Sequence, residues 1–435
     1  MPPPTAPPVA TETLARLHDG TLTGATHLDL RHCGLTTLPL EVLALAGTLQ
    51  VLDVSGNALT DLPGGLAACT RLHTLFASNN RFTHLPPVLG RLPALDTLGF
   101  KANQIEQVPA EALAPTLRWL ILTDNRIAEL PATLTRCTRL QKLMLAGNRL
   151  MRLPPGLAAL QNLELIRLSA NEFARVADAL PDELLALPRL AWLAHGGNPY
   201  NQVLEARAPQ ADRAPHIAWS RLQLQGLLGE GASGHIHAAL LDAEGAAQPV
   251  AVKLFKGAVT SDGLPASEMA ASIAAGTHPH LVGELGQIDG HPEGRLGLVM
   301  RRVPPQCRAL AGPPSMQSCS RDVYAPGLRL SARRAEGIAA AVASALGHLH
   351  GRGLAHGDLY AHNILVDGDD ADGATCLLSD LGAASFLPAD DPDRAAALRR
   401  LDWRAYAVLV DELAAHCDAP QALAPWHQQA AAHGA

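Results

Sequence analysis

A segment flanked by apolar residues places an aspartate and an asparagine five positions apart. Its sequence is HGDLYAHNIL at 356–365, with Asp358 and Asn363 at this spacing. A carboxylate can orient and deprotonate an attacking hydroxyl, and an asparagine can hold a metal ion that bridges a transferring phosphoryl group. A glycine-rich turn upstream and the tetrapeptide Ser-Asp-Leu-Gly at 379–382 add to this pattern. We therefore interpret the segment as one part of a site for phosphoryl transfer.

The glycine-rich turn follows a segment in which apolar and polar residues alternate. The sequence LQLQGLLGEGASGHIHAAL at 222–240 contains the pattern GxGxxGxI, with Gly229, Gly231 and Gly234. Glycines let backbone amides approach phosphate oxygens, although the pattern alone equally fits an ordinary turn. The next segment, VAVKLF, places Lys253 on an expected strand. From there its ammonium can reach the α- and β-phosphates of a nucleotide.

Together these segments resemble the protein kinase fold over residues from about 219 to about 416. The resemblance implies that Asp358 is the catalytic base. It also implies that Lys253 pairs with an acid on the first large helix, where Glu268 in PASEMAASIAAG is the only candidate.

The resemblance implies two cofactors, ATP and Mg²⁺. Asn363 and Asp380 are the implied metal ligands, and Asp380 follows the apolar strand TCLL. As a bare tripeptide Asp-Leu-Gly usually marks a turn, so the metal assignment depends on its place after the candidate base. The residues that the resemblance assigns to ATP binding are Gly229, Gly231, Gly234, Ile236, Ala251, Lys253, Arg301 and Val303.

Two helices are expected to support the catalytic loop. Ser331 is expected to N-cap a long helix that leads into the loop. Asp402 is expected at the start of a later helix, where it either caps the helix, anchors the loop, or does both.

The catalytic segment departs from the usual kinase pattern in several places. Gly357 stands where many kinases have arginine, so activity should not need a phosphorylated activation loop. Tyr360 stands where a lysine is usual, and His362 stands where tyrosine kinases carry an arginine. The source of transition-state charge neutralisation is therefore open. No Ala-Pro-Glu occurs between Asp380 and Asp402, which predicts a short activation segment and a shortened C-lobe.

Three functions remain open on this basis. The first is an active protein kinase, directed to serine or threonine, because the residues expected to contact ATP and metal are all retained. The second is a pseudokinase scaffold that binds nucleotide without transfer. The third is a small-molecule hydroxyl kinase, because HGD with a reduced substrate lobe also resembles aminoglycoside and choline phosphotransferases.

A repeated pattern occupies the N-terminal half. LDLRHCGLTTLP at 28–39 returns as VLDVSGNALTDLP, TLFASNNRFTHLP, TLGFKANQIEQVP, WLILTDNRIAELP and KLMLAGNRLMRLP. The pattern is a leucine-rich repeat signature, in which each unit buries its leucines against its neighbours. We expect the asparagine of each unit to pair with backbone groups that the turn leaves unpaired. These asparagines are Asn57, Asn80, Asn103, Asn125, Asn148 and Asn171.

Residues that alternate with the inward leucines should face the concave side of the repeat sheet. Phe76, Trp119 and Trp192 all fall on this expected exposed face, although the chain is only 3% aromatic. We predict that they bind a protein partner or substrate together with Ile121 and Met144. The alternative is that a flanking segment or the second domain packs there.

Composition limits the class of protein. The chain has 435 residues, 48% of them hydrophobic and 17% charged, which indicates folded domains. A net charge of −7 argues against a nucleic-acid partner. The absence of a signal sequence and of a long apolar run predicts a cytoplasmic protein that does not contact a membrane. Seven scattered cysteines without CxxC spacing are expected to be reduced thiols.

The expected fold is an α/β leucine-rich repeat solenoid followed by an α+β, bilobal, kinase-like domain. The expected boundaries are a Pro-rich tail at 1–20, repeats at 21–200, a linker at 201–218 and the kinase-like domain at 219–435. The linker is placed where the repeat periodicity stops.

Overall fold

The structure is a computed structural model, and it describes residues 8–207, 215–231, 233–243, 245–256, 259–260, 262–368 and 375–434. These residues divide into two compact units. The first unit holds the described residues up to Ile166 together with Asn171–Arg189, and the second holds Arg167–Ala170 and the described residues from Leu190 onward. In the described residues, no helix is long and apolar enough to cross a membrane.

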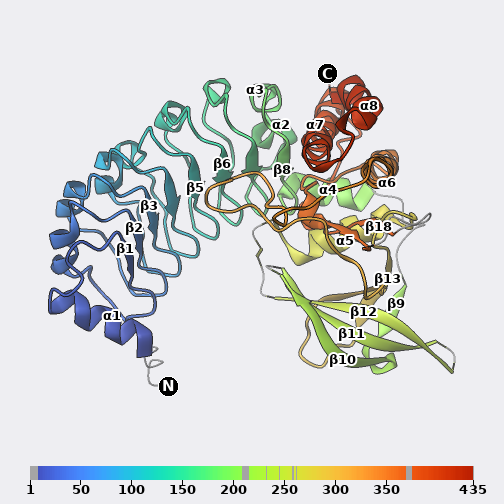
Figure 1. Cartoon of the computed structure of the whole chain (residues 1–435), viewed down its shortest axis with the longest axis horizontal. Helices are drawn as coiled ribbons and strands as arrows, with labels where there is room; N and C mark the ends of the chain where they lie inside the picture. The colour runs from blue at the N-terminus through green and yellow to red at the C-terminus, as the bar shows by residue number, and fades with distance from the viewer. Residues whose placement is uncertain are drawn as a thin grey trace. The chain divides into compact units, whose positions relative to one another are not determined.

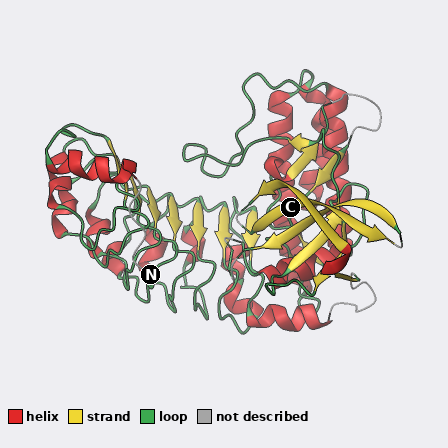
Figure 2. Cartoon of the chain, turned by 90° about the horizontal axis from the view of Figure 1, so that it is seen from below, coloured by secondary structure: helices red, strands yellow, loops and turns green. Residues whose placement is uncertain are grey.

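The first unit is a leucine-rich repeat solenoid, as expected. Short parallel strands pair with their neighbours in chain order, and they stand side by side in Figures 1 and 2. These strands are β1 (His27–Asp29), β2 (Val51–Asp53), β3 (Thr74–Phe76), β4 (Thr97–Gly99), β5 (Trp119–Ile121), β6 (Lys142–Met144) and β7 (Leu165–Arg167). The central residue of each strand, a leucine in β1 to β6 and Ile166 in β7, points inward, and Leu52, Leu75 and Leu98 are fully buried. The repeat therefore gains its stability from contact with the units on either side.

Each repeat returns through a short helical segment. These segments are η1 (Leu40–Leu45), η2 (Gly64–Ala68), η3 (Pro87–Arg91), η4 (Ala110–Ala112), η5 (Ala132–Arg136), η6 (Leu157–Ala159), α2 (Val176–Ala179) and α3 (Asp182–Leu185). The LeuPro or ValPro step of the sequence places a proline directly before the first five, with φ between −68° and −57°. Proline fixes this angle and so sets the direction in which the chain turns back. The described end of the Pro-rich tail forms helix α1 (Pro8–His18).

The predicted asparagine ladder is present. Asn125 donates from Nδ2 to the carbonyls of Phe100 and Leu122, at 2.9 and 3.0 Å, and accepts from the amide of Ile105 at 3.0 Å. Two of these contacts reach the preceding repeat, so each asparagine links neighbouring units. The same three bonds recur at Asn57, Asn80, Asn103 and Asn148.

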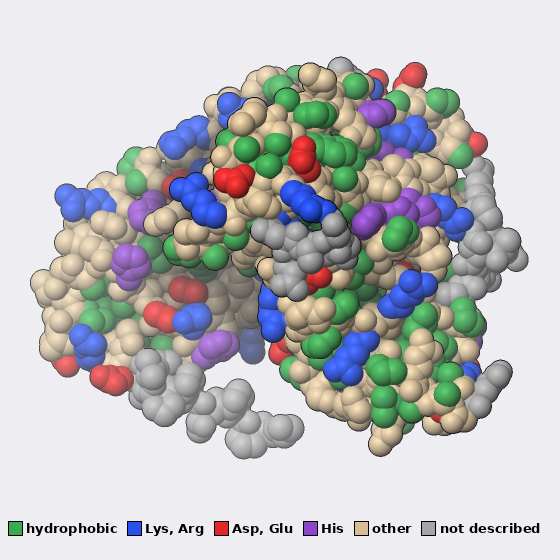
Figure 3. All heavy atoms as spheres, turned by 45° about the vertical axis from the view of Figure 1, so that its right-hand side comes forward, with side chains coloured by type: hydrophobic (Ala, Val, Ile, Leu, Met, Phe, Trp, Pro, Cys, Tyr) green, Lys and Arg blue, Asp and Glu red, His purple; other side chains and the backbone are tan. Residues whose placement is uncertain are grey.

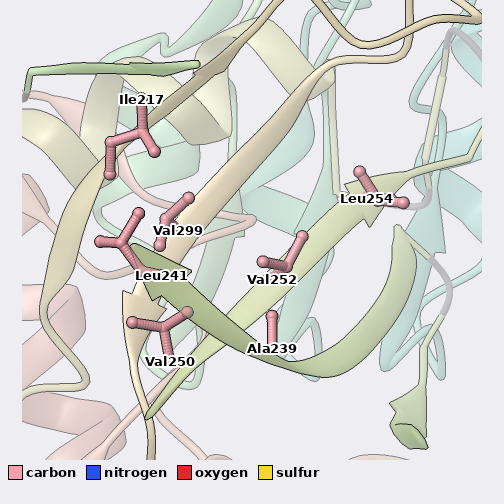
Figure 4. Close-up of a cluster of buried hydrophobic side chains, with 7 residues drawn as sticks. All are labelled: Ile217, Ala239, Leu241, Val250, Val252, Leu254 and Val299. Atoms are coloured by element: carbon pink, nitrogen blue, oxygen red, sulfur yellow. The ribbon is translucent and has the colours of Figure 1, made fainter. Parts of the chain in front are cut away.

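The second unit contains a six-stranded sheet in the order β10-β11-β12-β14-β13-β9. Its strands are β9 (His216–Ala218), β10 (Leu222–Glu230), β11 (Gly234–Ala243), β12 (Ala246–Phe255), β13 (Glu284–Asp289) and β14 (Gly297–Arg301). Figure 4 shows the apolar side chains of this sheet gathered in one cluster: Ile217, Ala239, Leu241, Val250, Val252, Leu254 and Val299. Helix α5 (Pro265–Ala275) contacts β13.

The expected linker contributes to this unit. Helix α4 (Pro199–Arg207) covers its start, and β9 at its end pairs in parallel with β13. Residues 208–214 lie outside the described residues. The repeat-derived part of the unit includes strand β8 (Trp192–Ala194) and Arg167–Ala170, with the amide of Leu168 bonded to the carbonyl of Ala194 at 2.7 Å.

The rest of the second unit is mainly helical. Its longest elements are α6 (Ala332–Gly351) and α7 (Pro392–His416), which pack on each other, and α8 (Ala424–Gly434) follows (Figure 1). The shorter elements are η8 (Trp219–Arg221), β15 (Arg308–Ala309), β16 (Leu354–Ala355), η9 (Ala361–Asn363), β17 (Ile364–Val366), β18 (Cys376–Leu378), β19 (Ser385–Phe386) and η10 (Pro420–Leu423).

The two expected helix starts had different outcomes. Ser331 does cap α6, because its hydroxyl accepts from the amide of Arg334 at 3.2 Å. The placement of Asp402 at a helix start was wrong. Asp391 caps α7, and Asp402 lies in the middle of this helix. Pro392, at the first helical position, is the sequence signal for the true start of α7.

Candidate active site

The catalytic segment brings Asp358 and Asn363 together. η9 turns the chain after Asp358, so that Nδ2 of Asn363 donates to the backbone carbonyl of Asp358 at 3.0 Å and to its Oδ2 at 3.1 Å. Since the nitrogen of the amide faces Asp358, its oxygen is the end that can face a cation. The spacing of five residues therefore places a carboxylate that is suited to accept a proton beside an amide oxygen that is suited to bind a metal ion.

Asp402 anchors this segment from α7, as expected. Its carboxylate accepts from the amides of His356 and Gly357 at 2.8 and 2.9 Å, and from Nε2 of His350 at 2.9 Å. Burial by itself would raise the pKa of Asp402, but the hydrogen bond and charge of His350 hold it below its ordinary value. A charged Asp402 thus fixes the backbone directly before Asp358.

Lys253 and Glu268 form a buried ion pair between β12 and α5. Burial opposes the charge on Lys253, but the carboxylates of Glu268 and Asp380 raise its pKa above the ordinary value. Lys253 therefore stays charged although it is only 8% exposed. A fixed cation at this place is the feature that nucleotide phosphates need.

Asp380 lies beside this pair. Its φ is +60°, and its Oδ1 accepts from the amide of Gly382 at 3.0 Å. A Cβ on Gly382 would lie 3.0 Å from Oδ1 of Asp380 and 3.6 Å from Oε2 of Glu268. The two carboxylates thus converge on the glycine of Asp-Leu-Gly, which leaves no room for a side chain there.

The glycine-rich turn joins β10 to β11. A Cβ on Gly234 would lie 2.5 Å from the carbonyl of Leu254, so packing requires a glycine at this position. A Cβ on Gly229 or Gly231 would meet nothing within 4 Å. Packing within the protein therefore does not explain these two glycines, and the approach of a ligand remains the predicted reason.

The other predicted ATP contacts lie on the same sheet. Ile236 on β11 pairs with Lys253, and Ala251 pairs with Met300 on β14. Arg301 ends β14 with its amide bonded to the carbonyl of Gly283 at 2.9 Å, and Val303 follows in a loop. All eight residues assigned to ATP binding thus come from β10, β11, β12, β14 or the segments that adjoin these strands.

Trp192 is not on an exposed face, so its assignment to a partner-binding surface was wrong. It is 1% exposed, its ring stacks on Tyr360 with centroids 4.4 Å apart, and its Nε1 donates to the carbonyl of Leu359 at 2.8 Å. The alternation rule gave the correct face of β8, but in the second unit that face packs on the catalytic segment.

The remaining predicted partner residues, Phe76, Trp119, Ile121 and Met144, belong to the first unit and are half-buried. Nζ of Lys142 lies 4.6 Å above the ring of Trp119. Binding of a partner at this strand face stays a prediction. On the face of the molecule drawn in Figure 3, apolar, basic and acidic side chains are intermingled.

Arg167 also lies at the catalytic segment, and the sequence pattern did not identify it as a site residue. Nη2 of Arg167 donates to Oδ1 of Asp358, and its Nε donates to Oδ1 of Asp262 at 2.8 Å. The one available signal was indirect: the catalytic segment lacks the usual basic residue at Tyr360, so a cation was needed from elsewhere.

Residues 222–416 match the model of the family described as protein tyrosine and serine/threonine kinase. No curated protein matches the chain. Among solved structures, an internalin from Listeria monocytogenes is similar at 22% sequence identity and a TM-score of 0.32, over 37% of this chain. The chain spans 45% of the length of that internalin chain.

Proposed function

We propose that the chain transfers the γ-phosphoryl group of ATP to a hydroxyl group of a protein, on serine or threonine, because residues 222–416 match the model of the protein tyrosine and serine/threonine kinase family. The observation that carries this proposal is the convergence of two pairs. Lys253 and Glu268 meet Asp380 on one side, and Asp358 meets Asn363 on the other. The amide of Ser379, directly before Asp380, donates to the carbonyl of Asn363 at 2.9 Å and so joins the two sides.

The residues present fit ATP and Mg²⁺. Asp380 and the amide oxygen of Asn363 are hard oxygen donors of the kind that Mg²⁺ prefers, and two such ligands plus substrate phosphates are usual for this ion. Lys253 would bind phosphate oxygens, while Glu268 keeps its ammonium in place. Bound Mg²⁺ supplies charge neutralisation and alignment of the phosphates.

Asp358 performs the proton chemistry in this proposal. Its carboxylate is positioned by Asn363 and by the anchored backbone at His356 and Gly357. It accepts a hydrogen bond from the acceptor hydroxyl, orients the oxygen for attack, and takes the proton as the oxygen bonds to the γ-phosphorus. The bond from this phosphorus to the bridging oxygen breaks in the same step, and ADP leaves with the bonding electrons.

One structural feature favours a second candidate, a small hydroxylated acceptor. Helix α7 begins at Pro392, so a segment of only 11 residues follows Asp380 before α7. Within it β19 pairs with β16. This segment offers little backbone on which an extended peptide can lie.

The test is transfer of label from γ-labelled ATP with Mg²⁺ by the full chain. The acceptors are a serine, threonine and tyrosine peptide library in one arm and small hydroxylated compounds in the other. We expect label on serine or threonine, and a loss of roughly 100-fold or more in Asp358→Asn, the usual scale for a general base. Label confined to small compounds would establish the second candidate, and nucleotide binding without transfer to either arm would establish a pseudokinase.

We further propose that the strand face bearing Phe76, Trp119, Ile121 and Met144 binds the protein acceptor. Half-buried aromatic and apolar side chains near a cation are suited to this role. With a protein acceptor, Trp119→Ala should raise KM, while kcat for a short peptide acceptor stays unchanged. Met151→Ala, at an apolar residue 56% exposed and outside the strands, is the control. An unchanged KM in Trp119→Ala would refute this binding face.

A further inference from the structure

Arg167 is a buried cation that hydrogen-bonds to the catalytic segment and to the segment before helix α5. Its Nη2 donates to Oδ1 of Asp358, its Nη1 donates to the carbonyl of Gly357 at 3.4 Å, and its Nε donates to Oδ1 of Asp262 at 2.8 Å. The residue is 3% exposed. Arginine keeps its charge when buried, so its placement demands anionic partners.

The catalytic segment itself directs no basic side chain at Asp358. The ring of Tyr360 stacks on Trp192. Nδ1 of His362 lies 2.7 Å from Oδ1 of Asp322, and the amide of His362 donates to the same carboxylate. The imidazole is therefore held by Asp322, while Arg167 is the cation that bonds to Asp358.

The backbone of the catalytic segment lies close to strand β8 at Gly357. Gly357 has φ of +73°, and a Cβ there would lie 2.4 Å from the carbonyl of Leu193 on β8. The amide of Leu193 donates to the carbonyl of Gly357 at 3.1 Å. A side chain at 357 would separate β8 from the segment, and the same contact brings Arg167 to Asp358.

We propose that Arg167 is a positioning residue for phosphoryl transfer, which the repeat strand β7 supplies to Asp358. This inference rests on the proposed function. Arg167 holds Oδ1 and Asn363 holds Oδ2, so the carboxylate has a single orientation. An ionised carboxylate has about four acceptor sites, so two remain for the acceptor hydroxyl.

The kinetic test uses the full chain and the acceptor found above. Arg167→Gln should lower kcat roughly 10- to 100-fold, as expected for a misplaced reacting group, and leave the KM for ATP unchanged. Arg167→Lys should restore part of kcat, because it returns the charge without the fork geometry. Arg334→Gln is the matched control, because Arg334 makes a buried ion pair with Asp367 at 3.2 Å in the same unit. It should keep kcat.

A second measurement does not depend on activity. Thermal unfolding of Arg167→Gln, Asp358→Asn and the double variant forms a cycle, in which the double variant should lose less Tm than the two single losses together. Additive losses overturn the pairing. With an active wild type, an unchanged or increased kcat in Arg167→Gln overturns the positioning role, and an increase would show that Arg167 masks Asp358. An inactive wild type refutes the proposed function instead.

Discussion

At the scale of single residues, the site depends on charged groups that are buried in pairs. Lys253 with Glu268 and Arg167 with Asp358 each join a cation to a carboxylate away from water. The net stabilisation from such a pair is small, because desolvation offsets the attraction, but removal of one partner leaves an uncompensated charge. These pairs therefore fix the positions of Lys253 and Asp358 more than they stabilise the fold.

Removal of one partner of the Lys253–Glu268 pair should lower the stability of the second unit. Glu268→Ala should destabilise the second unit by about 3–5 kcal/mol, because Lys253 is left buried without its main partner. The double variant Lys253→Met with Glu268→Met should lose much less, since two apolar side chains of similar size replace the pair. Denaturant unfolding of each variant measures both values. Equal losses in the two proteins would show that the ion pair itself stabilises the unit.

At the scale of elements, the solenoid depends on contacts between neighbouring repeats. A strand of three residues is too short to be stable alone, and its buried leucine and its asparagine both act on the adjacent unit. The side chain of Asn125 replaces the backbone partners that the turn cannot supply to Phe100, Leu122 and Ile105.

Removal of one ladder position should therefore be costly. Asn125→Ala leaves buried backbone groups without partners, and we expect a loss of about 1–3 kcal/mol in the unfolding free energy of the first unit. Asn162→Ala provides the comparison, because Asn162 bonds to the carbonyl of Thr138 at an exposed site. Urea unfolding should show a clearly smaller loss for Asn162→Ala. Similar losses would mean that burial of the ladder is not what stabilises it.

At the scale of the whole molecule, the repeat pattern of the sequence extends beyond the first compact unit. The sequence pattern continues to Asn198, yet Arg167–Ala170 and Leu190 onward belong to the second unit. This part of the pattern supplies Trp192, which packs on the catalytic segment through its contacts with Leu359 and Tyr360. The end of the repeat array therefore belongs to the core of the second unit.

Two tryptophans at equivalent strand positions test this division. Trp192→Ala should destabilise the second unit by about 3–5 kcal/mol, the cost of a large truncation in a core, and should lower kcat because Tyr360 loses its stacking partner. Trp119→Ala, at a half-buried residue of the first unit, should leave the unfolding of the second unit unchanged. Calorimetry resolves the two transitions. Equal effects of both substitutions would place Trp192 outside the core of the second unit.

Local patterns predicted most of the fold. The spacing of leucines and asparagines predicted the solenoid and its ladder. The segment VAVKLF predicted the strand that carries Lys253, and the resemblance to protein kinases predicted its pairing with Glu268. These features depend on neighbours in sequence or on repeated units, so the signal is present in each copy. Ser331 was found as a helix cap for the same reason.

Contacts between distant segments were not predictable in this way. Arg167 and Asp358 are 191 positions apart, and nothing near either residue specifies the other. Trp192 follows the same alternation as Trp119, but its face is covered by a segment from a different part of the chain. The sequence shows that Gly357 and Tyr360 depart from the usual kinase pattern. Only the structure shows that both residues pack against strand β8.

We propose that Lys253 and Asp380 face one magnesium nucleotide together with Asp358 and Asn363. Calorimetric titration of Mg²⁺ and ATP into the full chain tests it most directly, with Lys253→Met, Asp380→Asn and Asp358→Asn beside the wild type. We predict one site per chain, affinity lowered at least about 10-fold by each of the first two substitutions, and affinity retained in Asp358→Asn. Wild-type affinity in both Lys253→Met and Asp380→Asn would contradict the account.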